Sequence, residues 1–144
     1  MTQFRLDDFL PYLLNNAAES TSRAFSAHYR QAYGMTRAQW RIMAHLGSQG
    51  ALTASEICAR SFMEKSKVSR AVAGLQEAGL ITRAPSTSDR RVEHLHLTDK
   101  GRQVHLDLAA HATAFSESLE ARLGPDRMVL LAQILRELQD HPPG

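Results

Sequence analysis

The chain has 144 residues, of which 43% are hydrophobic and 22% are charged, with a formal net charge of +2. This length suits one domain with a modest hydrophobic core, and the single cysteine, Cys58, excludes an internal disulfide. The N-terminal ten residues carry charges, and no apolar run approaches the length of a membrane span. We therefore expect a soluble cytoplasmic protein without a signal peptide and without a membrane partner.

The first predicted helix covers about residues 9–33, where apolar side chains recur with the period of an amphipathic helix. We expect Asp7 or Asp8 to cap it, Pro11 to lie in its first turn and Gly34 to end it.

Two capping boxes follow. Thr-Arg-Ala-Gln at residues 36–39 and Thr-Ala-Ser-Glu at residues 53–56 both have the pattern in which two side chains satisfy free N–H groups of a first helical turn. They predict helices at about residues 37–47 and 54–60.

A further helix is predicted at about residues 65–78, because Val68, Val72 and Leu75 form an apolar stripe and Gly79 follows as a helix-ending residue. Residues 80–83 and 92–97 favour two short strands, and the polar segment 84–91 between them is typical of a loop. The two strands are expected to pair as a hairpin.

The last two predicted helices cover about residues 99–123 and 126–139, with Thr98 as the first cap and Gly124-Pro125 as the break between them. The fold class expected from these elements is mainly α with a small β-hairpin.

The segment around the hairpin predicts a winged helix-turn-helix. A tight turn at residues 61–63 separates two helices, and one α-helix fits the major groove of duplex DNA. The predicted recognition helix has no acidic residue between positions 65 and 76, and residues 60–91 as a whole are net positive, whereas the remainder is net negative. An ordinary solvated basic face is the alternative. The candidate DNA-binding residues on this helix are Lys65, Ser66, Lys67, Ser69 and Arg70.

The loop between the strands is the candidate wing. Arginines at a hairpin tip can enter a narrow minor groove, and a neighbouring carboxylate can hold a guanidinium in a bidentate grip. A flexible charged loop is the alternative interpretation. The candidate DNA-binding residues here are Ser86, Ser88, Asp89, Arg90 and Arg91.

Residues 89–101 match the pattern D-x-R-x-x-x-L-x-L-T-x-x-G of the MarR family of regulators, and residues 68–70 and 79–83 also resemble that family. The resemblance covers nearly the whole chain. It implies a DNA-binding lobe at about residues 36–98 and dimerisation helices at about 9–33 and 99–140. It also implies a homodimer on a pseudo-palindromic operator, usual repression, and release by a small ligand or an oxidant.

In this family the effector pocket is lined by the first, second and fifth helices. The segments 10–15 and 33–41 resemble regulators of aromatic-acid breakdown, some of which respond to aromatic acyl-CoA thioesters. Aromatic faces with one or two arginines suit an anionic aromatic compound, although Trp40 can equally be a core residue and the arginines can contact phosphate or solvent. The candidate effector-binding residues are Phe25, His28, Tyr29, Arg37, Trp40 and Arg41.

Other functions have weaker support. Cys58 lies in the short third helix rather than the first, with only Arg60 as a nearby cation, so oxidant sensing is a minor alternative. The helical histidines lack the three- or four-residue spacing of metal ligands, so no metal or other cofactor is expected and a metal-responsive regulator is a second minor alternative. No catalytic motif indicates an enzyme. A protein-interaction module would favour a neutral or acidic recognition face.

Overall fold

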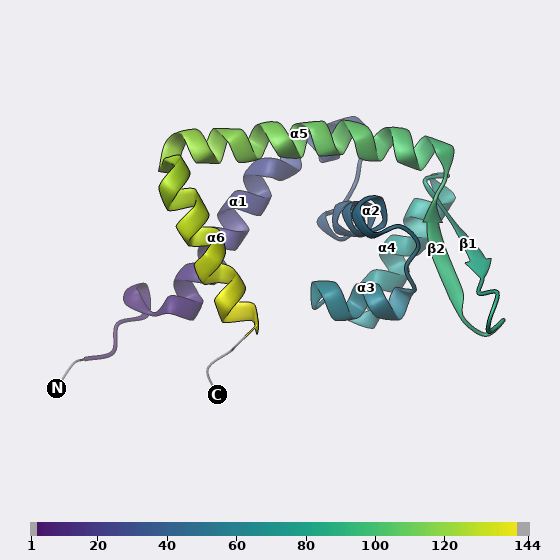
Figure 1. Ribbon diagram of the computed structural model, residues 1–144, viewed down its shortest axis with the longest axis horizontal. Helices are drawn as coiled ribbons and strands as arrows, with labels where there is room; N and C mark the ends of the chain where they lie inside the picture. The colour runs from purple at the N-terminus through teal and green to yellow at the C-terminus, as the bar shows by residue number, and fades with distance from the viewer. Residues whose placement is uncertain (1–2, 141–144) are drawn as a thin grey trace. The chain divides into compact units, whose positions relative to one another are not determined.

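The computed structural model describes residues 3–140, and its contacts separate the chain into two compact units, residues 1–109 and 110–144. The protein is mostly helical with one two-stranded antiparallel sheet, as the sequence predicts. Figure 1 labels its helices and strands. The first unit holds η1 (Leu6–Asp8), α1 (Leu10–Tyr33), α2 (Arg37–Gln49), α3 (Ala54–Ser61), α4 (Lys65–Glu77), β1 (Ile81–Pro85), β2 (Glu93–Leu97) and the first part of α5 (Asp99–Leu123). The second unit holds the remainder of α5 and α6 (Pro125–Asp140).

The predicted cap of the first helix is wrong. Asp7 and Asp8 lie in the short 3-10 turn η1, and the N-cap of α1 is Phe9, whose side chain cannot accept a hydrogen bond. The reason is that η1 takes up the acidic residues one turn before α1 begins. The other end agrees with the prediction, because Gly34 adopts a left-handed conformation with φ 61° and closes the helix.

Both predicted capping boxes are present. The Thr36 hydroxyl accepts a hydrogen bond from the Gln39 backbone N–H at 3.2 Å, and the Gln39 side chain accepts one from the Thr36 N–H at 2.9 Å. Thr53 and Glu56 make the same reciprocal pair at 3.1 and 3.0 Å. Each box fixes where its helix starts, and a cap of this kind contributes on the order of 1 kcal/mol to the stability of the folded protein.

The core of the first unit forms where α2, α3, α4 and the hairpin meet. The side chains of Ile42, Met43, Ile57, Leu75 and Leu95 are essentially inaccessible to solvent. Burying each such side chain contributes about 1.5–3 kcal/mol to the free energy of folding. Packing of this cluster therefore fixes the orientation of α4. Ala71 joins the predicted stripe of α4 as a fourth buried position.

The hairpin pairs Ile81 with Leu97 and Pro85 with Glu93 in antiparallel register. The first strand therefore extends two residues beyond the predicted 80–83, and the second begins at Glu93 rather than at residue 92. Proline is tolerated at this place because it lies at the end of a strand that has only one neighbour.

The junction between α4, the hairpin and α5 explains two residues of the sequence pattern. The Thr98 hydroxyl donates to the Gly79 carbonyl at 2.6 Å and accepts from the Gly101 N–H at 3.0 Å. A Cβ atom at Gly101 would lie 2.0 Å from the Leu80 carbonyl oxygen. A hydroxyl at position 98 and the absence of a Cβ atom at position 101 therefore allow this close approach, and the hairpin is anchored to the start of α5.

Among residues 3–140, no helix is both long enough and apolar enough to cross a membrane.

Candidate nucleic-acid interface

The predicted recognition helix presents its polar residues to solvent. Val68, Ala71, Val72 and Leu75 are buried on one side of α4. The opposite side is exposed and carries all the candidate residues of this helix, namely Lys65, Ser66, Lys67, Ser69 and Arg70.

The cations of α4 form no ion pair in the described part of the chain. Within residues 3–140, no carboxylate lies within ion-pair distance of Lys65, Lys67 or Arg70. The N-cap residue Glu64 also makes no side-chain cap, so its carboxylate does not bond the first-turn N–H groups. The start of α4 therefore offers free positive charge and free backbone donors on one surface, which is what a phosphate group binds.

The turn that precedes α4 places one aromatic side chain in solvent. Phe62 adopts a left-handed conformation with φ 55°, which is strained for a residue with a Cβ atom, and its side chain is 89% exposed. This residue ends α3 and lets the chain reverse tightly into α4, as the turn predicted at residues 61–63 requires.

The wing contains the predicted brace, in a different geometry. One oxygen of Asp89, Oδ1, accepts from both the backbone N–H and the Nε–H of Arg91, at 3.0 and 3.3 Å. We expected a bidentate contact between both carboxylate oxygens and the guanidinium, and this expectation is wrong. Because Asp89 and Arg91 are two residues apart, one oxygen reaches both the backbone and the side-chain donor. The Arg91 side chain is 91% exposed, so its guanidinium is oriented but still accessible.

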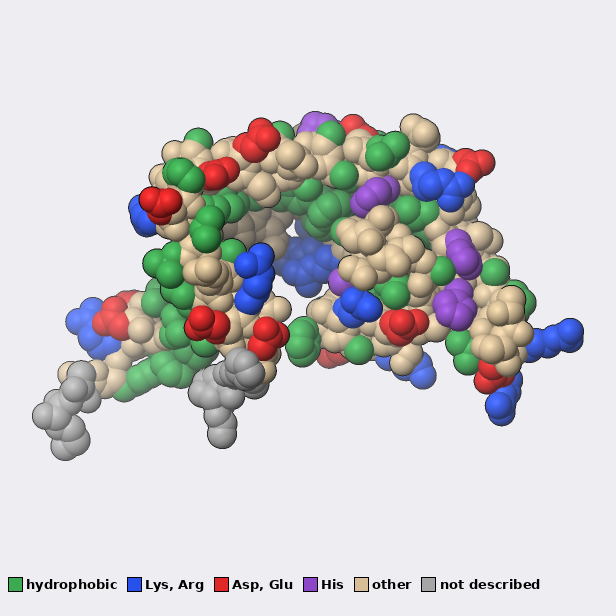
Figure 2. All heavy atoms as spheres, viewed as in Figure 1, with side chains coloured by type: hydrophobic (Ala, Val, Ile, Leu, Met, Phe, Trp, Pro, Cys, Tyr) green, Lys and Arg blue, Asp and Glu red, His purple; other side chains and the backbone are tan. Residues whose placement is uncertain are grey.

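The other wing residues close the loop or extend from it. Ser86 and Ser88 bond to each other through their hydroxyls at 3.0 Å, and the Ser86 N–H donates to the Val92 carbonyl at 2.7 Å. The two serines therefore shape the turn, while Arg90 is exposed. Figure 2 shows Lys and Arg side chains projecting from the wing.

Three of the predicted effector residues form one aromatic cluster between α1 and α2. The ring centroids of Phe25 and Trp40 are 5.0 Å apart, and Tyr29 stacks on Trp40 at 6.0 Å. Tyr29 is 1% exposed, whereas Phe25 and Trp40 are partly buried against the core. Trp40 thus belongs to the edge of the core and also contributes to an aromatic surface.

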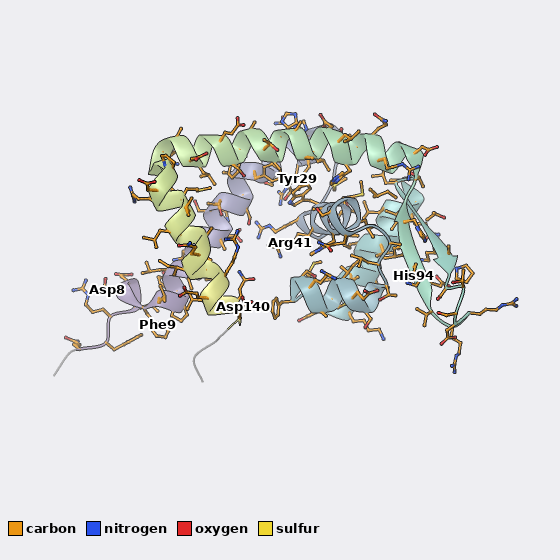
Figure 3. All side chains as sticks on the ribbon, viewed as in Figure 1. Asp8, Phe9, Tyr29, Arg41, His94 and Asp140 are labelled. Carbon is orange, nitrogen blue, oxygen red and sulfur yellow. The ribbon has the colours of Figure 1, made fainter. Side chains whose placement is uncertain are left out.

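The remaining three predicted effector residues lie in separate environments. His28 Nε2 lies 2.9 Å from Asp107 Oδ2, and the Tyr33 hydroxyl donates to the same oxygen at 2.5 Å, which raises the pKa of Tyr33 to about 12. Arg41 is exposed on α2 (Figure 3). No sequence pattern pointed to Asp107, because it lies 79 positions from His28.

Arg37 is bound by a residue that sequence reasoning missed. Its Nη1 and Nη2 groups donate to Oε2 and Oε1 of Glu19 at 2.8 and 3.3 Å, and Arg23 donates to Oε1 at 3.2 Å. Hydrogen bonds from Arg37 and then Arg23 lower the pKa of Glu19 to about 2. The only sequence signal was the four-residue spacing of Glu19 and Arg23 on a helix.

Comparisons with known proteins identify the fold. A family model described as MarR family matches residues 33–92. The HTH-type transcriptional repressor MdtR of Bacillus subtilis strain 168 is 33% identical over 105 residues, which are 73% of this chain and 68% of that protein. The chain belongs to the MarR family.

Solved structures agree over nearly the full length. A MarR family transcriptional regulator from Silicibacter pomeroyi DSS-3 is 32% identical, with a TM-score of 0.83 over 96% of this chain and 98% of that one. NadR, solved in complex with 4-hydroxyphenylacetate, is 25% identical, with a TM-score of 0.82 over 96% of this chain and 97% of that one.

Membership of the MarR family makes this protein a DNA-binding transcriptional regulator and not an enzyme, as the sequence predicts.

Proposed function

We propose that this protein is a cytoplasmic, homodimeric repressor that binds a pseudo-palindromic operator and leaves it when an aromatic acid or its CoA thioester binds. The observation that carries the proposal is the exposed basic face of α4, which has no acidic partner among residues 3–140 and is held from behind by four buried residues.

The DNA contacts divide between two elements. The N-terminal half of α4 enters the major groove, where Arg70 donates to a base edge or phosphate and the lysines bind phosphates. Arg90 and the braced Arg91 enter the adjacent minor groove from the wing. Ser66 and Ser69 have short polar side chains, which allow the helix backbone to approach the DNA closely.

The dimer is proposed from exposed apolar side chains in each unit. In the first unit, Phe4, Phe9 and Leu13 are 69%, 48% and 46% exposed. In the second unit, Val129 and Leu130 on α6 are 59% and 55% exposed. Large apolar surfaces of this kind mark interfaces, so residues 9–33 and 99–140 are assigned to dimerisation and residues 36–98 to the DNA-binding lobe.

The effector is proposed from the chemistry between α1 and α2. A partly exposed aromatic surface beside a guanidinium suits a ring that carries a carboxylate. The fact that NadR was solved with 4-hydroxyphenylacetate supports this class of ligand for a family member of similar fold.

The proposal is tested by selecting duplexes from genomic DNA and measuring binding at rising salt. A specific operator should remain bound as salt increases, whereas non-specific binding collapses because it depends on counterion release. The selected site should contain two half-sites about one helical turn apart. A chain that sediments as a monomer at micromolar concentration, or that retains no preferred site, would contradict the proposal.

A further inference from the structure

We propose that the carboxylate of Glu19 occupies, in the free protein, the place that the carboxylate of the effector takes on Arg37, and that Glu19 thereby sets which anions bind. This inference rests on the proposed aromatic effector and names the residue that the effector must displace.

The geometry around Glu19 is that of a carboxylate-binding site. Arg37 donates two hydrogen bonds, one to each carboxylate oxygen, at 2.8 and 3.3 Å. This paired geometry is the one in which a guanidinium recognises any planar carboxylate. Arg23 adds a second guanidinium at 3.2 Å, so two cations surround one anion and the cluster keeps a net positive charge.

Arg37 also retains an unused donor. Its Nε atom is buried and has no hydrogen-bond partner within the described part of the chain, residues 3–140. A buried donor without an acceptor is costly, and a ligand that brings a further acceptor in addition to its carboxylate removes that cost. Glu19 therefore fills this site incompletely.

Protonation does not open the pair. The hydrogen bonds from Arg37 and Arg23 hold the pKa of Glu19 near 2, and the same bond raises the pKa of Arg37. Both groups stay charged at every physiological pH, so the pair is released by a competing anion and not by a change of acidity.

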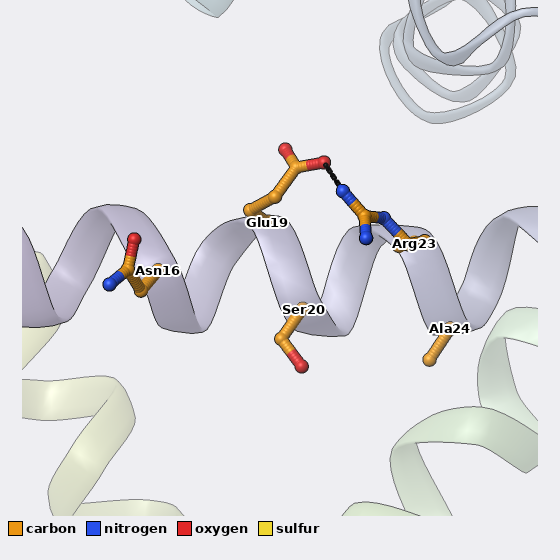
Figure 4. A pocket seen from close by; sticks show the side chains of 5 residues that line it. All are labelled: Asn16, Glu19, Ser20, Arg23 and Ala24. Carbon is orange, nitrogen blue, oxygen red and sulfur yellow. Dashed lines mark hydrogen bonds and ion pairs between the residues drawn. The ribbon is translucent and has the colours of Figure 1, made fainter.

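The surroundings of the pair are compatible with an aromatic anion. Trp40 lies three residues after Arg37 on α2 and belongs to the cluster with Phe25 and Tyr29. On the α1 side, Glu19 and Arg23 line an open concavity of about 460 Å³ together with Asn16, Ser20 and Ala24 (Figure 4). This volume is within the range of small-molecule sites.

Displacing Glu19 has a mechanical consequence. The pair ties α1 to the first residue of α2, the helix that supports α3 and α4. When an external carboxylate binds Arg37, the ion pair that connects α1 to the DNA-binding lobe is lost. A ligand that binds the released state more tightly then shifts the protein toward it.

The test compares acids with their matched carboxamides on the full-length protein. The probes are benzoate, 4-hydroxybenzoate and 4-hydroxyphenylacetate, and binding is followed by calorimetry and by the fluorescence of Trp40, the only tryptophan. Glu19→Gln should bind the acids about fivefold more tightly than the unsubstituted protein, which is the gain expected when one partly exposed competing ion pair is removed. The carboxamides should bind both proteins equally.

Two control variants separate the possible outcomes. Arg23→Gln removes a cation but leaves Glu19 on Arg37, so it should give no gain. Arg37→Gln should abolish the preference for acids. A loss of folding alone would change binding of acids and amides together, and therefore would not imitate the expected result.

The outcomes distinguish this inference from the proposed function. If Glu19→Gln binds acids no more tightly than the unsubstituted protein while Arg37→Gln loses them, Glu19 is not the competitor, although the aromatic effector stands. If Arg37→Gln binds acids unchanged, or if no protein binds any of them, the assignment of a free aromatic acid as the effector falls together with this inference.

Discussion

The basic residues of α4 and those between α1 and α2 differ in how their charge is balanced. On α4, Lys65, Lys67 and Arg70 face solvent, and no carboxylate within residues 3–140 lies within ion-pair distance of them. Between α1 and α2, Arg23 and Arg37 share the carboxylate of Glu19. Unpaired cations bind a polyanion directly, whereas paired cations bind an anion only if it displaces the internal one.

The same contrast appears in the helix starts. Helices α2 and α3 begin with complete capping boxes, which use their first-turn N–H groups internally. Helix α4 begins without a side-chain cap. The supporting helices are therefore fixed by their own side chains, while the start of the recognition helix keeps donors for phosphate.

The largest expected effect comes from removing the unpaired arginine of α4. Arg70→Ala should cost about 1–3 kcal/mol of operator binding, or roughly tenfold to more than a hundredfold, because a base or phosphate contact is lost. Fluorescence anisotropy with a labelled operator measures this loss. Arg30→Ala, an exposed arginine at the end of α1, is the matched control. Equal affinities for the two variants would remove Arg70 from the interface.

A smaller effect is expected at a lysine that contacts only phosphate. Lys67→Ala should weaken binding to all duplexes by a similar factor and reduce the slope of log affinity against log salt by about 1. Titrations at several salt concentrations with operator and unrelated DNA measure both quantities. A change confined to the operator would mean that Lys67 contacts bases instead.

The wing should contribute less than α4. Arg91→Ala should weaken operator binding by about threefold to tenfold, because one exposed cation and its minor-groove contact are lost. Asp89→Asn should have a smaller effect, since it weakens the brace by removing its charge but leaves the guanidinium. Normal affinity in the arginine variant would show that the wing is passive.

The smallest effect concerns acidity at the paired surface. The pKa of Glu19 is about 2, below the ordinary value of 4.5 that the unfolded chain has. Its contribution to stability is therefore complete above pH 4.5 and is lost as the pH falls toward 2. Carboxyl carbon NMR shifts of Glu19 across this range provide the measurement. Titration of Glu19 near 4.5 would mean that the pair with Arg37 is not formed in solution.

Local patterns predicted most of the elements, because the interactions that define them lie within a few residues. The capping boxes at Thr36 and Thr53, the glycine that ends α1 and the buried stripe of α4 are all short-range. The predicted cap at Asp7 or Asp8 is wrong because the acidic residues can start either of two adjacent turns, and the sequence pattern does not distinguish between them.

The candidate DNA-binding side chains were also accessible to sequence reasoning. The period of α4 separates Val68 and Val72 from the polar residues, so the exposed face follows from helical geometry alone. The partners of the candidate effector residues were not accessible in this way. Glu19 and Arg37 are 18 positions apart, and His28 and Asp107 are 79 positions apart.

Sequence patterns were sufficient to predict the helices, the hairpin, the basic face of α4 and the family pattern at residues 89–101. They could not predict which cations remain unpaired and which are neutralised, because an ion pair between separate helices depends on how those helices pack. Helical period determines which face a side chain occupies, but only packing determines which charge it meets there.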